Sequence, residues 1–215
     1  MERIRTLLKS KEPVKWLFYG DSITHGALHT FGRRDYTELF SERVRFEMKR
    51  PLDVVINTAI SGNNTGVLIR QFDWRVRQFE PHVVFLMIGM NDCSADIAIS
   101  PDEFSANLDR LCDLIGEFGG LPVLQTTCPI LPGTAPERQP HFPAYMEVIR
   151  DVARNRKLPL VDHERHWEAN KEKHYYWMSN AFHPNAEGHR AFARFMFESL
   201  DIFDADAASC RFFIP

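Results

Sequence analysis

The stretch WLFYGDS, residues 16–22, is a short apolar run that ends in a glycine and two small polar residues. A near-continuous apolar run of this kind is typical of a strand that is buried on both faces, as in a parallel sheet. Glycine lets the backbone turn sharply where a side chain would obstruct it. The stretch therefore predicts a buried strand that is followed at once by a polar turn.

Four further apolar runs follow, at residues 54–56, 83–88, 122–126 and 158–161, and amphipathic stretches separate them. We expect these runs also to be buried on both faces. Helical patterns lie around residues 36–44, 100–118, 145–152 and 192–200, and Ser100 with Glu103 predicts a capping box at the start of the second. Such alternation predicts an α/β fold with a parallel sheet between layers of helices.

Composition and charge are those of an ordinary globular domain, and we expect one domain over residues 1–215. Hydrophobic residues make up 44% of the chain and charged residues 26%, both close to average. The formal net charge of -3 gives no bulk electrostatic reason to bind nucleic acid or an anionic membrane. No run approaches the ~20 apolar residues of a membrane span. Because the N-terminus also lacks the apolar core of a signal peptide, we expect a cytoplasmic protein.

The cysteine and histidine spacings do not predict a metal centre. The four cysteines contain no CxxC pair, so we expect reduced thiols. Three histidines lie near two acidic residues, but no HExxH or paired-cysteine frame joins them: His163, His166, His174, Asp162 and Glu164. We therefore expect neither a metal ion nor an organic cofactor.

Small polar residues follow the first three runs, where ligands bind in parallel sheets. Ser22 is a candidate nucleophile, but it needs a base to take its proton. The best candidate base is His183, which lies just before the last helix. Acyl transfer also needs donors aimed at a developing oxyanion, and the amides of Ser22 and Gly62 and the side chain of Asn91 are plausible.

Four sequence blocks resemble the SGNH (GDSL-type) hydrolase family. They are Gly-Asp-Ser at 20–22, the isolated Gly62, Gly-x-Asn-Asp at 89–92 and His-Pro-Asn at 183–185, in the family's order and over almost the whole chain. The resemblance implies a three-layer α/β/α sandwich, flavodoxin-like, with a five-stranded parallel sheet of order 2-1-3-4-5. It also implies ester hydrolysis through an acyl-serine intermediate.

The chain departs from the family pattern at one position. The family usually has Asp three residues before the histidine, and here that residue is Asn180. Asn can still accept a hydrogen bond from the imidazole through its carbonyl oxygen, but it brings no negative charge. Three alternatives stay open: Asn180 orients His183, another carboxylate or a backbone carbonyl replaces the Asp, or the site is weakened and does not catalyse.

We expect a serine esterase that acts on short acyl esters, such as O-acetyl groups on a carbohydrate, with Ser22, His183 and Asn180 as its catalytic residues. Ser22, Gly62 and Asn91 would form the oxyanion hole. The alternative is a degenerate hydrolase that binds an acylated glycan without cleaving it. A nucleotide-binding flavodoxin-like domain is disfavoured, because residues 20–26 hold neither a P-loop lysine nor GxGxxG.

Other features leave alternatives open. Tyr175, Tyr176 and Trp177 can stack on a sugar ring or pack in the core. His25 and His29 follow the serine closely, and we expect ordinary surface histidines there.

A loop with five prolines, residues 129–143, can form a wall of the substrate cleft. The apolar tail, residues 211–215, can pack on the domain or join a homo-oligomer interface.

Overall fold

The computed structural model describes residues 1–26 and 28–211 and contains one five-stranded sheet of order β2-β1-β3-β4-β5. All four strand pairings are parallel. The strands are β1 (Lys15–Gly20), β2 (Val54–Asn57), β3 (Val83–Met87), β4 (Leu121–Gln125) and β5 (Leu160–Val161). The predicted fold class and strand order are confirmed. Residues 212–215, most of the apolar tail, lie outside the described residues.

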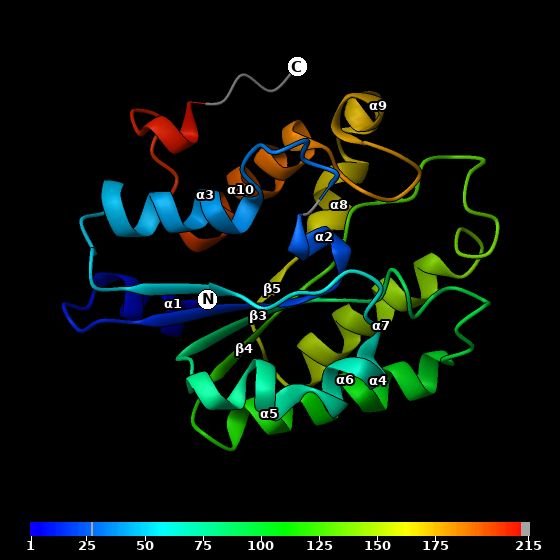
Figure 1. Cartoon of the computed structure of the whole chain (residues 1–215), viewed down its shortest axis with the longest axis horizontal. Coiled ribbons are helices and arrows are strands. Elements are labelled where there is room, and N and C mark those ends of the chain that lie inside the picture. The colour runs from blue at the N-terminus through cyan, green and yellow to red at the C-terminus, as the bar shows by residue number, and fades with distance from the viewer. Residues whose placement is uncertain (27, 212–215) are drawn as a thin grey trace.

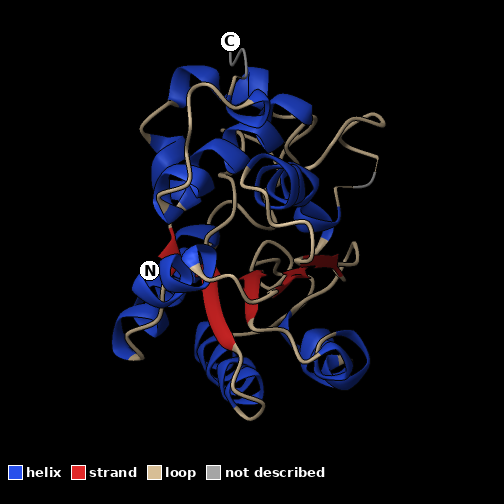
Figure 2. Cartoon of the chain, turned by 90° about the vertical axis from the view of Figure 1, so that its left-hand side faces the viewer, coloured by secondary structure: helices blue, strands red, loops and turns tan. Residues whose placement is uncertain are grey.

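Helices cover both faces of the sheet. Figure 1 shows α3 and α10 on one face and α5, α6 and α7 on the other, and Figure 2 shows the strands between these layers. The longer helices are α1 (Glu2–Lys9), α3 (Tyr36–Glu42), α6 (Pro101–Gly116), α7 (Phe142–Asn155) and α10 (Ala186–Leu200). The shorter ones are α2 (Ser22–His25), α4 (Thr65–Arg70), α5 (Phe72–Arg75), α8 (His163–Glu168) and α9 (His174–Trp177). A π-helix, Arg43–Glu47, continues α3.

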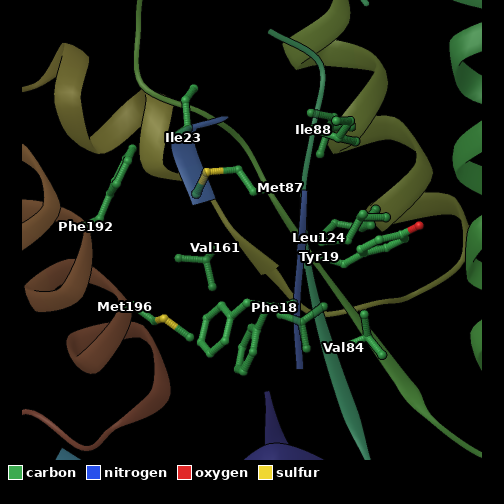
Figure 3. Packing of buried hydrophobic residues seen from close by; sticks show 14 of the residues in the cluster. Phe18, Tyr19, Ile23, Val84, Met87, Ile88, Leu124, Val161, Phe192 and Met196 are labelled. Atoms are coloured by element: carbon green, nitrogen blue, oxygen red, sulfur yellow. The ribbon is translucent and has the colours of Figure 1, made fainter. Parts of the chain in front are cut away.

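Alternate side chains of β1 pack into the hydrophobic core on the two faces of the sheet. Phe18 stacks on Phe85 of β3, with ring centroids 4.8 Å apart. It also contacts Phe40 of α3 edge-to-face, with ring centroids 5.3 Å apart. Tyr19 points to the other face, where its hydroxyl donates to the Leu68 carbonyl of α4 at 2.7 Å. Figure 3 shows Phe18 on the side of α10 and Tyr19 on the opposite side of the sheet. Because apolar side chains pack on both faces, β1 is held firmly beneath the polar turn that follows it.

Two local expectations need correction. Strand β2 is not buried on both faces, because it is an edge strand and Val54 is 47% exposed. Ser100 does cap α6, and its hydroxyl accepts the Glu103 amide at 3.1 Å. The structure records no return bond from the Glu103 side chain, however, so the cap is only half of the predicted capping box.

Candidate active site

Ser22 is the first residue of α2, immediately beyond the carboxyl end of β1. Gly20 is required there by close packing, because a Cβ at this position would overlap the Met87 carbonyl oxygen of β3. Asp21 then caps the short helix, and its carboxylate accepts the Ile23 amide at 3.0 Å. Burial raises the pKa of this carboxyl to about 7. The local sequence thus fixes Ser22 at the polar edge of the sheet.

His183 reaches the same edge from the other end of the chain. It lies between α9 and α10, where Met178 and Pro184 form an antiparallel bridge and Ser179 donates to the His183 carbonyl at 2.8 Å. This hairpin-like segment directs the imidazole toward α2. His183 Nε2 lies 2.8 Å from Ser22 Oγ. That distance is the one a general base needs for proton transfer.

Asn180 fixes the imidazole from behind. Its Oδ1 accepts the backbone amides of Phe182 at 3.2 Å and His183 at 3.0 Å, and it lies 3.0 Å from His183 Nδ1. Since two backbone N–H groups need an acceptor there, the amide oxygen and not the NH2 group must face the ring. His183 Nδ1 therefore carries the hydrogen, and Nε2 is left as the acceptor for the Ser22 hydroxyl.

The surroundings of His183 keep it neutral. Burial lowers its pKa to about 4, and the Arg138 guanidinium and, when it is protonated, His29 act in the same direction. Asn180 adds no negative charge to oppose them. At neutral pH the imidazole is therefore unprotonated and free to accept a proton.

The three expected oxyanion donors belong to elements that the structure brings together. The loop after β2 lies beside the carboxyl end of β1, just before Ser22, since Ile60 N donates to the Gly20 carbonyl at 3.2 Å. Gly62 in this loop has φ +82°, and a Cβ there would meet no atom within 4 Å. Asn91 joins the same loop from β3, and its Nδ2 donates to the Asn63 carbonyl at 2.8 Å. One hydrogen of that NH2 group remains for another acceptor.

Asp92, the residue after Asn91, contacts the first residue of α4. Its carboxylate accepts the Thr65 amide at 2.8 Å and also the Thr65 hydroxyl. This contact ties the end of β3 to the residues that follow Gly62. Burial raises the pKa of Asp92 to about 6.

The proline-rich loop packs against the His183 segment. Leu131 N donates to the Ala181 carbonyl at 2.8 Å, and the Arg138 guanidinium lies 4.5 Å from the Phe182 ring centroid. The last of its prolines, Pro143, belongs instead to the first turn of α7. The loop therefore supplies the side of the site that faces Phe182.

The two histidines that follow the serine, expected to be ordinary surface residues, make contacts that the sequence did not predict. His29 is partly buried, and its ring stacks on His183 with centroids 3.8 Å apart and planes 10° apart. His25 is exposed, and its Nδ1 lies 3.1 Å from Ser61 Oγ beside Gly62. Neither contact has a sequence signal, because both depend on how the loops fold back over α2.

Of the three aromatic residues at 175–177, one packs in the core and two are exposed, where they can stack on a sugar ring. Trp177 is buried and packs on Trp167, with ring centroids 4.9 Å apart. Tyr175 and Tyr176 are 71% and 64% exposed. Core packing is therefore correct for the tryptophan and wrong for the two tyrosines.

The histidines that follow β5 serve the core. His163 is fully buried and pairs with Gln125 at 3.1 Å, and His174 lies 2.8 Å from the Trp167 carbonyl. His166 stacks on Phe195 of α10 at 4.2 Å. Within the part of the chain that the structure describes, no three His, Cys, Asp or Glu side chains gather in a way that could hold a metal ion.

The sequence of this chain matches the model of the GDSL-like Lipase/Acylhydrolase family over residues 18–191. The chain belongs to this family. The match runs from β1 into α10 and so includes the serine, the glycine, the asparagine and the histidine described above.

Two sequence relatives are similar to this family member over part of their length. An uncharacterised protein of Mycoplasma pneumoniae is 33% identical over 111 residues, which are 50% of this chain and 12% of that protein. The lipoprotein YqeF of Bacillus subtilis is 24% identical over 173 residues, which are 69% of this chain and 70% of that protein. The chain therefore spans only a small part of the first relative.

Solved structures share the fold at low identity. The lipase/acylhydrolase of Enterococcus faecalis has a TM-score of 0.78 at 23% identity, over 87% of this chain and 95% of that one. LAE5, an alpha/beta hydrolase from the Lake Arreo metagenome, has a TM-score of 0.75 at 23% identity, over 89% and 98%. A mutant of Axe2, an acetylxylan esterase of Geobacillus stearothermophilus, has a TM-score of 0.75 at 21% identity, over 93% and 100%.

No helix within residues 1–26 and 28–211 is long and apolar enough to cross a membrane.

Proposed function

We propose that this GDSL-family chain is a serine esterase that hydrolyses short acyl esters through an acyl-serine intermediate. The observation that carries the proposal is the 2.8 Å contact between Ser22 Oγ and His183 Nε2. The tautomer that Asn180 imposes supports it, because the lone pair of Nε2 then faces the serine hydroxyl. The first of the three alternatives for Asn180, that of an orienting residue, is the one that this geometry favours.

The reaction follows from these contacts. Ser22 Oγ attacks the ester carbonyl while its proton moves to His183 Nε2, and the carbonyl electron pair moves onto the oxygen. The amides of Ser22 and Gly62 and the free hydrogen of Asn91 would hold this oxyanion. His183 then gives its proton to the leaving alkoxide as the ester C–O bond breaks. A water molecule, deprotonated by His183, releases the acid and restores Ser22.

We propose an O-acetylated carbohydrate as the ester. Tyr175 and Tyr176 lie five and four positions before Asn180 and are mostly exposed, and such ring faces suit a sugar. Axe2, with which the chain shares its fold, is an acetylxylan esterase. Forms of Axe2 with a serine, a histidine or an aspartate replaced are described as catalytic mutants of that enzyme. In Axe2 that aspartate lies three residues before the histidine, and in this chain Asn180 lies three residues before His183.

A second candidate function is that of a binding protein for acylated glycans. The neutral Asn180 is the one observation in its favour, because it does not stabilise an imidazolium as a carboxylate would. The intact Ser22–His183 contact counts against it.

The test is turnover of p-nitrophenyl acetate by the wild type and by Ser22→Ala. We expect the wild type to release nitrophenol and the variant to fall to the uncatalysed rate, and equal rates would contradict the assignment of Ser22. A panel of acetylated sugars and of p-nitrophenyl esters of increasing chain length then identifies the substrate. Binding of an acetylated sugar without release of acetate would favour the second candidate.

A further inference from the structure

His183 lies against one further ring. His29, in the loop between α2 and α3, stacks face to face on the imidazole, with centroids 3.8 Å apart and an angle of 10° between the planes. Both residues are partly buried. The ring of His183 is thus held at two places: Asn180 fixes one edge by a hydrogen bond, and His29 covers one face.

Asn180 fixes direction but supplies no charge. When the Ser22 proton reaches His183, an imidazolium forms with a neutral amide behind it and the Arg138 guanidinium nearby. Both features disfavour the cation. In the usual arrangement of the family a carboxylate offsets this cost. A group that supports the imidazolium is therefore needed elsewhere in this site.

The face of a neutral aromatic ring can supply that support. A cation that stacks on such a face is attracted by the ring's electron density. Burial lowers the pKa of His29, so His29 is neutral at neutral pH. His189 of α10 is buried, its ring stacks on Tyr36, and burial lowers its pKa as well. When the proton from Ser22 arrives, His183 is therefore the charged ring of the stacked pair, and His29 is the neutral one.

We propose that His29 is a positioning residue for the general base. Its ring holds the plane of His183 so that Nε2 points at Ser22, and its face stabilises the imidazolium that forms when the serine proton moves. This inference rests on the proposed esterase function. It explains how a site with Asn180 in place of a carboxylate remains catalytic.

The first test compares His29→Ala, which removes the ring, with His29→Phe, which keeps a planar ring that does not titrate. Turnover of p-nitrophenyl acetate should show kcat roughly tenfold lower in His29→Ala with KM little changed, and most of the loss should be restored in His29→Phe. His166→Ala is the matched control, because it also removes an imidazole that stacks on a ring, that of Phe195 at 4.2 Å. A wild-type kcat in His29→Ala, or no recovery in His29→Phe, would overturn the proposal.

The second test does not depend on turnover. In a Ser22→Ala background, NMR titration of the imidazole nitrogens gives the pKa of His183 directly. His29→Ala should lower that pKa because the ring face that stabilises the imidazolium is lost, and His29→Phe should keep it at the value of the Ser22→Ala parent. A pKa that rises in His29→Ala would show that His29 acts only by excluding water. An unchanged titration in His29→Ala would overturn the stack as a determinant of His183. If the wild type hydrolyses no ester, the proposed function fails, while this titration still decides whether His29 governs the imidazole.

Discussion

Asn180 Oδ1 lies 3.0 Å from His183 Nδ1, and the same oxygen accepts the His183 backbone amide at 3.0 Å. The side chain that holds the imidazole is therefore itself held by the backbone of the residue it orients. Asn180 thus presents a neutral amide oxygen to the imidazole, at the position where the family resemblance implies a carboxylate.

The first prediction concerns this contact. Asn180→Ala removes the acceptor for Nδ1, so the tautomer is no longer fixed and kcat should fall at least about tenfold. Asn180→Asp keeps the acceptor and adds a negative charge, so kcat should be comparable or higher. Steady-state kinetics on p-nitrophenyl acetate measure both. Full turnover in Asn180→Ala would show that Asn180 has no catalytic role.

The second prediction is a pH profile that extends into the acid range. His183 must be neutral to accept the serine proton, and burial lowers its pKa to about 4. Activity is therefore lost only as the pH falls through that value, and kcat/KM should still be close to its plateau at about pH 5. Nitrophenol release at its isosbestic wavelength gives the profile. Samples returned from acid to neutral pH should recover full activity. A midpoint near the ordinary histidine pKa would contradict the account.

The third prediction concerns the oxyanion loop. Gly62 has φ +82° and open space where a Cβ would lie. Gly62→Ala should strain the backbone by roughly 1–2 kcal/mol. Its methyl group would also enter the open space next to the Gly62 amide, the expected oxyanion donor, so kcat/KM should fall at least about tenfold.

A matched glycine separates the two effects. Gly119 has φ +80° and equally open space, but it lies just before the amino end of β4, at the opposite edge of the sheet. Gly119→Ala should cost similar stability and leave kcat/KM unchanged. Equal losses of activity in the two variants would mean that Gly62 acts only through stability.

The fourth prediction concerns stability and Asp21. Burial raises the pKa of this carboxyl from 3.8 to about 7, so the folded chain holds the proton more tightly than the unfolded chain does. This contribution is present below pH 3.8 and is lost as the pH rises to about 7. Asp21→Asn removes it, and Asn can still cap α2. As the pH rises from about 5 to about 8, the variant should therefore gain stability relative to the wild type, by at most about 3 kcal/mol.

Urea unfolding at the two pH values measures this difference. Effects of the substitution that do not depend on pH cancel between them. A stability difference that is the same at both values would mean that Asp21 does not carry the raised pKa.

The strands and the central pair of the site could be predicted because their signals are local. A run such as residues 16–19 is apolar throughout, and a parallel sheet carries whatever follows it to one edge. Ser22 and His183 were therefore expected to meet although 161 residues separate them. Their catalytic roles, with those of Gly62 and Asn91, stay predictions until activity is measured.

The remaining features depend on tertiary context. Val54 belongs to an apolar run like those of the buried strands. Its exposure depends on the position of β2 at the edge of the sheet, which the run does not reveal. Helices as short as α4 and α9 carry too few residues to show a periodicity. The stack of His29 on His183 depends on the loop that follows α2, where Gly26 has φ +70°. No spacing in the sequence specifies that contact.

The central claim is that Ser22 is a nucleophile activated by His183, and covalent labelling tests it most directly. A fluorophosphonate should react with the wild type to give a single adduct, which tandem mass spectrometry should locate on Ser22, and His183→Ala should react far more slowly. An unlabelled wild type, or an adduct on another residue, would contradict the account.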